Sequence, residues 1–268
     1  MEVNTLTGLL DKMWADYVAI NPLAQKIYDI FKSEGEEIFN DHIALRTFNH
    51  PRVTIDVIAK PFIEAGYKYS GDYHFTEKKL YAKHYEHSDD KYPKIFISEL
   101  KLQDFSTDLQ KTVNGLIDQM PEGLEFKFDF TSMGRPWNVS TETYEKLLKE
   151  SDYAAWLAAF GYRPNHFTVF INKLKKFSDI LFLNTYLKEK GIKLNASGGE
   201  VKGSKEVLLE QSSTLANSID VKFSDKTIPV PACYYEFAKR YAMPNGKLYT
   251  GFVAASADKI FESTNQGQ

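Results

Sequence analysis

Apolar residues recur at helical spacing over the first part of the chain. Residues 4–33 carry this pattern, which Pro22 interrupts and which Gly35 follows as a stop signal. The pattern predicts helices within an N-terminal segment, residues 1–38.

The hydrophobic period changes after this segment. Alternating residues predict a strand at 42–48, and helical spacing returns at 54–66, where Pro61 interrupts the helix and Gly66 ends it. Three more strand-like stretches follow, at residues 67–75, 79–88 and 93–102. The order β-α-β-β-β therefore predicts a first module over residues 39–102.

Residues 103–162 read as a mainly helical connector. Residues 106–120 begin with a Ser/Thr capping signal, and so do residues 140–161, whose apolar stripe ends at Gly161. We expect one helix in each stretch, with an irregular segment around Gly134 and Pro136 between them.

The pattern of the first module then recurs over residues 163–268. A strand at 166–172 and a helix at 176–191 precede strand-like stretches at 192–204, 207–223 and 228–242. The leading histidine and the helix-ending glycine lie 24 residues apart in the first copy (42 to 66) and 25 in the second (166 to 191). Such an internal repeat predicts two equivalent structural units.

The two βαβββ modules predict an α+β fold in one domain, residues 1–268. Paired modules would form a curved, barrel-like mixed sheet around a cleft, with the N-terminal and central helices packed outside. The first strand of each module would lie near the centre. His42 and His166, which open these strands, would then both point into the cleft.

A carboxylate near the end of the second module completes a candidate metal site. Glu236 lies in a strand-like aromatic stretch and shares a face with Tyr234. Two histidines and one carboxylate form the facial triad that holds non-haem iron and leaves three positions open. A 2-oxo acid would take two of these positions and O2 the third. The residues alone leave iron, zinc and manganese open.

Arg46 lies on the face of His42, two pleats further along and about 6–7 Å away by strand rise. Its guanidinium suits a carboxylate at the far end of a substrate, bound bidentately. The polar residues Gln211 and Ser213 interrupt an apolar stretch and are candidates for binding the substrate. An edge strand would explain them nearly as well.

Each candidate also has a structural interpretation. Either histidine alone could be a hydrogen-bonded core residue, and Arg46 could pair with Glu99 or Asp41. Glu236 could pair at a sheet edge with Lys239 or Arg240. The remaining histidines suggest no chemistry, and we expect the following three at the surface or rim: His74, His84 and His87.

Composition narrows the class of protein. Hydrophobic residues make up 43% and charged residues 26%, and the net charge of −3 gives no basic field for nucleic acid or anionic lipid. Cys233 is the single cysteine, which excludes an intrachain disulfide. No window approaches the roughly 18 apolar residues of a membrane span, and the N-terminus carries no targeting pattern. We expect a cytoplasmic protein without nucleic-acid or membrane partners.

Several stretches resemble the 2-oxoadipate dioxygenase/decarboxylase family. They are DHIALRTF (41–48), GRPW (134–137), YAAWLAAFGYRPNHFTV (153–169), YYEFAKRY (234–241) and GFVAASADKIFEST (251–264). The resemblance implies a vicinal-oxygen-chelate-like fold, Fe(II), and conversion of 2-oxoadipate and O2 to 2-hydroxyglutarate and CO2 in lysine breakdown.

Carried over by position, the family's metal ligands fall on His42, His166 and Glu236, and its substrate-carboxylate arginine falls on Arg46. The chain is shorter than the best-characterised members between the glutamate and the C-terminus, which leaves the exact 2-oxo acid open. Two alternatives stay beside this interpretation: a zinc-, nickel- or manganese-dependent lyase or isomerase of the same fold, and a non-catalytic binding protein.

Overall fold

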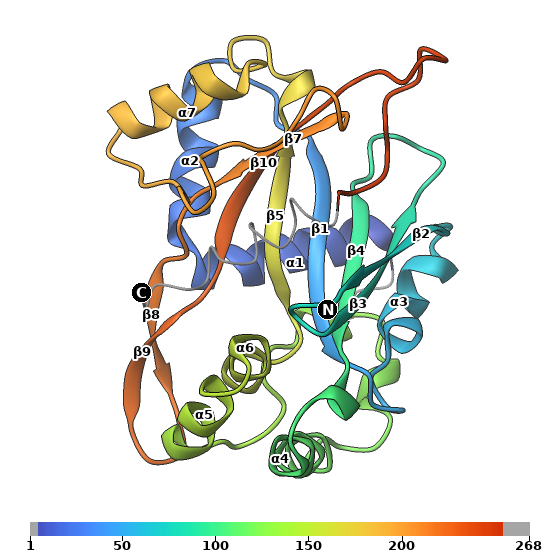
Figure 1. Cartoon of the computed structure of the whole chain (residues 1–268), viewed down its shortest axis with the longest axis vertical. Coiled ribbons are helices and arrows are strands. Elements are labelled where there is room, and N and C mark those ends of the chain that lie inside the picture. Colours follow the sequence, from blue (N-terminus) through green and yellow to red (C-terminus); the bar gives the residue numbers. More distant parts are fainter. Residues whose placement is uncertain (1–4, 254–268) are drawn as a thin grey trace.

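A curled eight-stranded mixed sheet forms the centre of the molecule (Figure 1). The structure is a computed structural model that describes residues 5–253. The strand order is β2-β3-β4-β1-β5-β10-β7-β6, and β8 and β9 form a separate two-stranded sheet. The strands are β1 Asn40–Phe48, β2 Lys68–Phe75, β3 Leu80–Glu86, β4 Lys94–Leu100, β5 Pro164–Phe170, β6 Lys202–Ser204, β7 Leu209–Ser213, β8 Ser218–Lys222, β9 Thr227–Pro231 and β10 Tyr234–Arg240.

The sheet order confirms the predicted repeat. The first strands of the modules, β1 and β5, pair antiparallel at the centre. Each also pairs in parallel with the last strand of its own module, β4 or β10. The remaining strands extend outward in the same order on both sides, so the two halves are related by an approximate two-fold arrangement. The predicted α+β class with a curved mixed sheet is confirmed.

Helices cover one face of the sheet and one end of the molecule (Figure 1). Trp14 and Tyr17 of the first helix contact Phe167 and Tyr235, whose side chains point away from the histidine-bearing face. The helices are α1 Leu6–Ile20, α2 Pro22–Ser33, α3 Ile55–Glu64, α4 Thr107–Ile117, α5 Thr141–Leu148, α6 Asp152–Phe160 and α7 Ile180–Glu189, with short 3-10 turns at Leu102–Asp104, Leu124–Phe126, Phe130–Ser132 and Ile171–Lys173.

The second module differs from its prediction in three stretches. Of residues 192–204, only β6 pairs as a strand, and Gly198 and Gly199 adopt positive φ angles in the preceding loop. The stretches 207–223 and 228–242 each divide into two strands. Their inner halves, β8 and β9, leave the main sheet as a hairpin because β9 contains prolines that cannot donate ladder hydrogen bonds in a central strand.

The connector also contains one more helix than predicted, because Ser151 divides residues 140–161. Its backbone is extended (φ −153°), and its hydroxyl accepts a hydrogen bond from the amide of Ala154, which starts α6. This division matters for the site because α6 is buried along its length and contacts β1, where the hydroxyl of Tyr153 accepts a hydrogen bond from the amide of Thr47.

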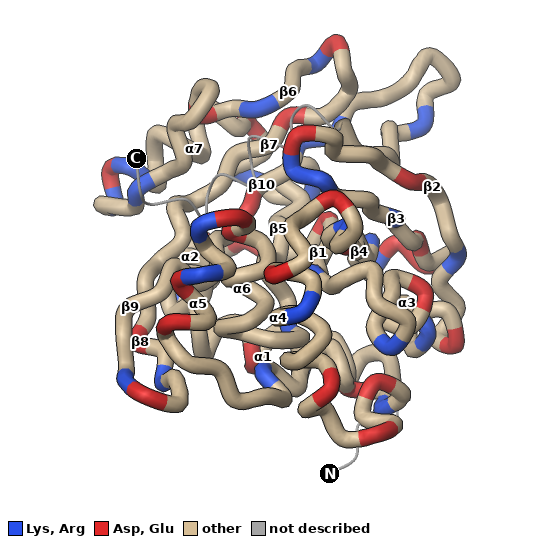
Figure 2. The backbone as a smooth tube through the Cα atoms, turned by 60° about the horizontal axis from the view of Figure 1, so that its bottom comes forward, with Lys and Arg blue, Asp and Glu red and all other residues tan. Residues whose placement is uncertain are grey.

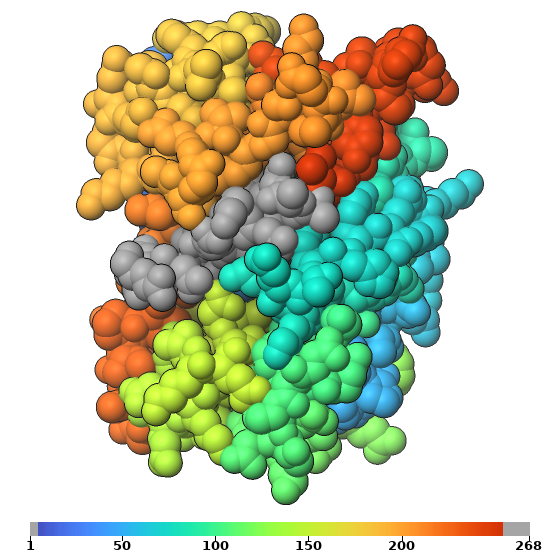
Figure 3. Space-filling model, in the orientation of Figure 1, coloured from blue at the N-terminus to red at the C-terminus, as the bar shows by residue number. Residues whose placement is uncertain are grey.

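Charged residues are distributed without a stripe of one sign in the view of Figure 2. In the space-filling view of Figure 3, the last described residues (red) lie against the first module (cyan). A hydrogen bond of 3.1 Å from the amide of Phe252 to the hydroxyl of Tyr73 joins these two parts. The last described residues thus pack against the edge strand β2 of the first module.

Two glycines that each follow a helix test how closely the turn between α6 and β5 packs against the segment around Gly134. A Cβ atom on Gly161 (φ +69°) would lie 2.2 Å from the carbonyl oxygen of Gly134, whereas one on Gly191 (φ +77°) would meet no atom within 4 Å. Gly191→Ala should cost about 1–2 kcal/mol from the backbone alone. Gly161→Ala should cost about 1–3 kcal/mol more because of the clash. Chemical denaturation measures both, and equal losses would contradict this packing.

Candidate metal centre

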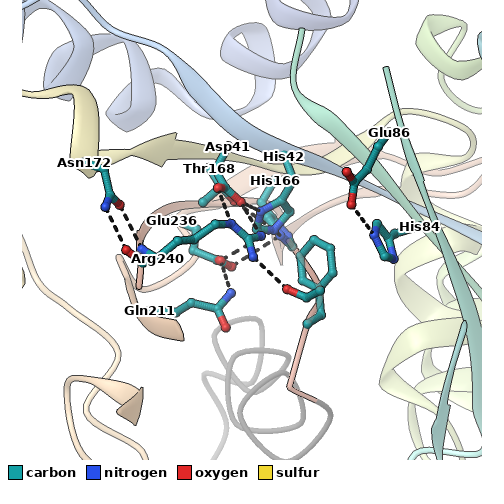
Figure 4. A network of polar contacts seen from close by, with 12 residues as sticks. Asp41, His42, His84, Glu86, His166, Thr168, Asn172, Gln211, Glu236 and Arg240 are labelled. Atoms are coloured by element: carbon teal, nitrogen blue, oxygen red, sulfur yellow. Dashed lines mark hydrogen bonds and ion pairs between the residues drawn. The ribbon is translucent and has the colours of Figure 1, made fainter. Parts of the chain in front are cut away.

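Three buried side chains converge on the face of the sheet opposite α1 (Figure 4). His42, His166 and Glu236 come from the adjacent central strands β1, β5 and β10, and their ligand atoms lie within 4.8 Å of one another. The two imidazole Nε2 atoms are 3.4 Å apart. The carboxylate oxygens of Glu236 lie 3.5 Å from Nε2 of His42 and 3.3 Å from Nε2 of His166.

Each imidazole has an oxygen partner at its other nitrogen. Nδ1 of His42 donates to Oδ2 of Asp41 at 2.8 Å, and Nδ1 of His166 lies 3.1 Å from Oδ1 of Asn165. Such bonds leave the Nε2 lone pairs directed at the centre of the cluster and orient the rings, as partners of metal-bound histidines do. The hydroxyl of Thr168 lies 3.1 Å from Nε2 of His42.

Asp41 is in turn held by a buried arginine. Arg240 makes two hydrogen bonds to its carboxylate, at 2.6 and 2.8 Å. The proposed pairing of Asp41 with Arg46 is therefore wrong, and so is that of Glu236 with Arg240. The same guanidinium also donates to the carbonyl oxygens of Tyr249 and Gly251.

The electrostatics of the cluster suit a cation. Burial lowers the pKa of His42 below its usual value and that of His166 well below it. Both rings are therefore neutral, and each has a nitrogen lone pair available for a metal. Burial also raises the pKa of Glu236 to about 8, although a hydrogen bond of 2.5 Å from Gln211 opposes the rise. A divalent cation would stabilise the carboxylate in this buried place. Two nitrogens and a carboxylate oxygen therefore fit a transition metal.

Arg46 lies next to the cluster and is buried. Its guanidinium stacks on the rings of Tyr153 and Trp156 of α6, at 4.9 and 5.0 Å from their centroids. Its charge contributes to the lowered pKa of His166, which places it near that ligand. Glu99, the alternative partner, accepts a hydrogen bond of 3.0 Å from the amide of Ile55.

The predicted substrate residues Gln211 and Ser213 also lie on this side of the sheet and are buried. Ser213 is the register partner of Glu236, and the amide of Gln211 donates to the Glu236 carboxylate. The structure therefore brings all the predicted site residues into one region, and it gives Gln211 a contact with a candidate ligand that the sequence did not predict.

Sequence reasoning missed the pair Asp41 and Arg240, and it misjudged one histidine. Asp41 directly precedes His42, and Arg240 shares the strand face of Glu236, so spacing could have placed each residue near the site, but not the contact between them. His84 was expected at the rim but is 2% exposed, because the ring of Phe252 covers it. The last predicted motif, residues 251–264, lies mostly outside the described residues.

A curled sheet built from two equivalent modules around a buried cluster of two histidines and one carboxylate is a vicinal-oxygen-chelate-like fold. A glyoxalase superfamily protein from Ralstonia eutropha JMP134 shares this fold, with a TM-score of 0.76 at 21% identity over 91% of this chain and 84% of that one. The family model for 2-oxoadipate dioxygenase/decarboxylase matches residues 2–122 and 130–249, and the chain belongs to this family.

Three proteins are similar at higher identity; the two from plants are named for the reaction of 2-oxoadipate, and the bacterial one is described as a hydrolase. The chain is 34% identical to the chloroplastic 2-oxoadipate dioxygenase/decarboxylase of Arabidopsis thaliana, over 97% of this chain and 78% of that protein. The hydroxyglutarate synthase of Oryza sativa, solved in complex with 2-oxoadipate, is similar with a TM-score of 0.92 at 31% identity over 99% and 96% of the two chains. A Shewanella frigidimarina NCIMB 400 protein has a TM-score of 0.90 at 53% identity over 95% of this chain and 100% of that one.

Within residues 5–253, none of the helices combines the length and apolar character needed to cross a membrane.

Replacing Asp41 by Asn tests its effect on His42. An amide orients the ring less strongly and makes it less basic, so Asp41→Asn should weaken divalent metal binding by about ten- to a hundredfold. Competition with a chromophoric chelator measures the Kd at a temperature where thermal unfolding shows the protein folded. Asp72→Asn, at the exposed edge strand β2, is the matched control and should leave the Kd unchanged. Equal affinity in both variants would contradict the role of Asp41.

Proposed function

We propose that the protein is an Fe(II)-dependent dioxygenase and decarboxylase of a 2-oxo dicarboxylic acid, converting 2-oxoadipate and O2 to 2-hydroxyglutarate and CO2. The observation that carries the proposal is the buried cluster of His42, His166 and Glu236 with Arg46 beside it, in a chain of this family. The six carbons of 2-oxoadipate reappear as five in the product and one in CO2, and O2 is the oxidant. The reaction would belong to lysine breakdown, as the family resemblance implies.

His42, His166 and Glu236 would hold the metal. Fe(II) bound by two histidines and one carboxylate supplies open positions for a 2-oxo acid and the redox chemistry that O2 requires. The chain's own contribution begins with preorganisation. Asp41 and Asn165 orient the two imidazoles, and the amide of Gln211 orients the carboxylate of Glu236.

Arg46 would bind the distal carboxylate of the substrate. Stacking on Tyr153 and Trp156 limits its side-chain freedom, so little further entropy is lost when it binds an anion. A substrate held at both ends cannot rotate away from the reacting position. We retain Gln211 and Ser213 as predicted substrate contacts, since both line the same face beside Glu236.

Burial is the third contribution of the chain. The candidate ligands are at most 4% exposed, so water is largely excluded from them. Low water content strengthens the charge interactions of Arg46 and the metal with the substrate and limits side reactions of the oxidant.

Assays with and without O2 test the reaction. Protein loaded with Fe(II) should consume O2 and release CO2 from 2-oxoadipate, and His166→Ala should abolish both because one ligand is lost. His74→Ala, whose side chain is 69% exposed, is the control and should behave like wild type. Turnover without O2 would instead favour a metal-dependent lyase or isomerase. Activity of His166→Ala equal to wild type would overturn the site.

A second variant tests the carboxylate clamp. Arg46→Lys keeps the charge but loses the bidentate fork and the stacking, so the KM for 2-oxoadipate should rise by about ten- to a hundredfold. The KM for 2-oxohexanoate, which has the same chain length without the distal carboxylate, should change little. Steady-state kinetics with both acids measures the difference, and an equal rise for both would contradict the clamp.

A further inference from the structure

A tyrosine beside the candidate ligands has a hydroxyl group that has no hydrogen-bond partner among residues 5–253. Tyr234 is 0% exposed, and its hydroxyl oxygen is buried without a hydrogen bond from any described residue. Buried polar groups are nearly always hydrogen-bonded, because losing water without a replacement is unfavourable. A hydrogen-bond acceptor on a bound ligand would supply the missing partner of the hydroxyl.

The position of Tyr234 directs its hydroxyl to the metal side of the sheet. Tyr234 begins β10, is the register partner of His166, and stacks on its imidazole with ring centroids 4.6 Å apart and an interplanar angle of 26°. Glu236, two residues along the same strand, projects from the same face. The hydroxyl of Tyr17 donates to the backbone carbonyl of Tyr234 at 2.5 Å and fixes this end of the strand from the opposite side.

The strand register places Tyr234 in the row of the sheet that contains a candidate metal ligand. Tyr234 pairs with His166, and His166 pairs with Ala44 of β1, two residues before Arg46. Because the Tyr234 ring stacks on the His166 imidazole, the side chain lies beside the candidate metal site.

We propose that Tyr234 contacts the substrate, its hydroxyl donating a hydrogen bond to the 2-oxo acid end of the bound molecule. This inference rests on the proposed function. A neutral phenol is a suitable donor to an oxygen that carries negative charge, and such bonds are stronger than those between neutral groups. The role differs from that of Arg46, which would hold the distal carboxylate at the other end.

The next residue provides a matched control. Tyr235 is likewise 0% exposed, and its buried hydroxyl has no hydrogen-bond partner among the residues that the structure describes, but alternation turns its side chain to the other face of the sheet. There it lines a separate cavity of about 430 Å³ together with Trp14, Tyr28 and Phe167. Tyr234→Phe and Tyr235→Phe thus make the same chemical change on opposite faces of one strand.

Substrate binding without turnover is the test. The Fe(II)-loaded wild type and both variants are titrated calorimetrically, without O2, with 2-oxoadipate and with 2-oxohexanoate. Tyr234→Phe should weaken the binding of both acids by a similar factor of about ten to a hundred, because both share the 2-oxo acid end. Tyr235→Phe should bind both like wild type. Neither variant should lose affinity for Fe(II) or unfold at a lower denaturant concentration, since neither hydroxyl has a hydrogen-bond partner in the described part of the chain.

The outcomes separate this inference from the proposed function. If wild type binds 2-oxoadipate and Tyr234→Phe binds it equally well, the role of Tyr234 is overturned and the proposed function stands. If Tyr234→Phe weakens only 2-oxoadipate, the hydroxyl serves the distal carboxylate, and the assignment to the 2-oxo acid end is overturned. If wild type binds neither acid, the proposed function fails and this inference fails with it.

Discussion

The antiparallel pairing of β1 with β5 is the contact on which the rest of the structure depends. It joins the two modules along their first strands and places Ala44 opposite His166. The imidazoles of His42 and His166, which lie 124 residues apart in the chain, therefore meet at 3.4 Å. Phe252 packs against the His42 ring and Tyr234 stacks on the His166 ring, and the burial of both rings lowers their pKa values, so that each imidazole is neutral and can bind a metal.

The repeat supplies two equivalent histidines, and departures from the repeat supply the rest of the site. In the parallel pairs, His42 is opposite Lys94 and His166 is opposite Tyr234. Two residues beyond these partners lie Phe96 in the first module and Glu236 in the second, so the carboxylate has an aromatic counterpart. Because the histidines of both modules meet at one place, the modules form a single site, to which only the second module contributes a carboxylate.

Much of this arrangement could be predicted from the sequence, because it depends on local periods and on a repeat. The strand positions of His42, His166, Arg46 and Glu236 follow from alternation and from the matching order of elements. The link between Asp41 and Arg240 joins residues 199 positions apart, and no local pattern encodes it. The β8–β9 hairpin was missed because its strands continue the hydrophobic pattern of their neighbours, and only the prolines of β9 indicated that it leaves the sheet.

The Arg240 guanidinium connects the orientation of a candidate ligand with the position of the last described residues. Its positive charge balances that of Asp41, so this carboxylate can remain ionised in the interior. The carboxylate then accepts a hydrogen bond from Nδ1 of His42. It also binds the carbonyl oxygens of Tyr249 and Gly251, just before Phe252 packs against the His42 ring at 4.8 Å. A buried ion pair adds little stability by itself, but here both charges make further hydrogen bonds. Removing either partner would therefore disturb the ring of His42 and the segment that covers it together.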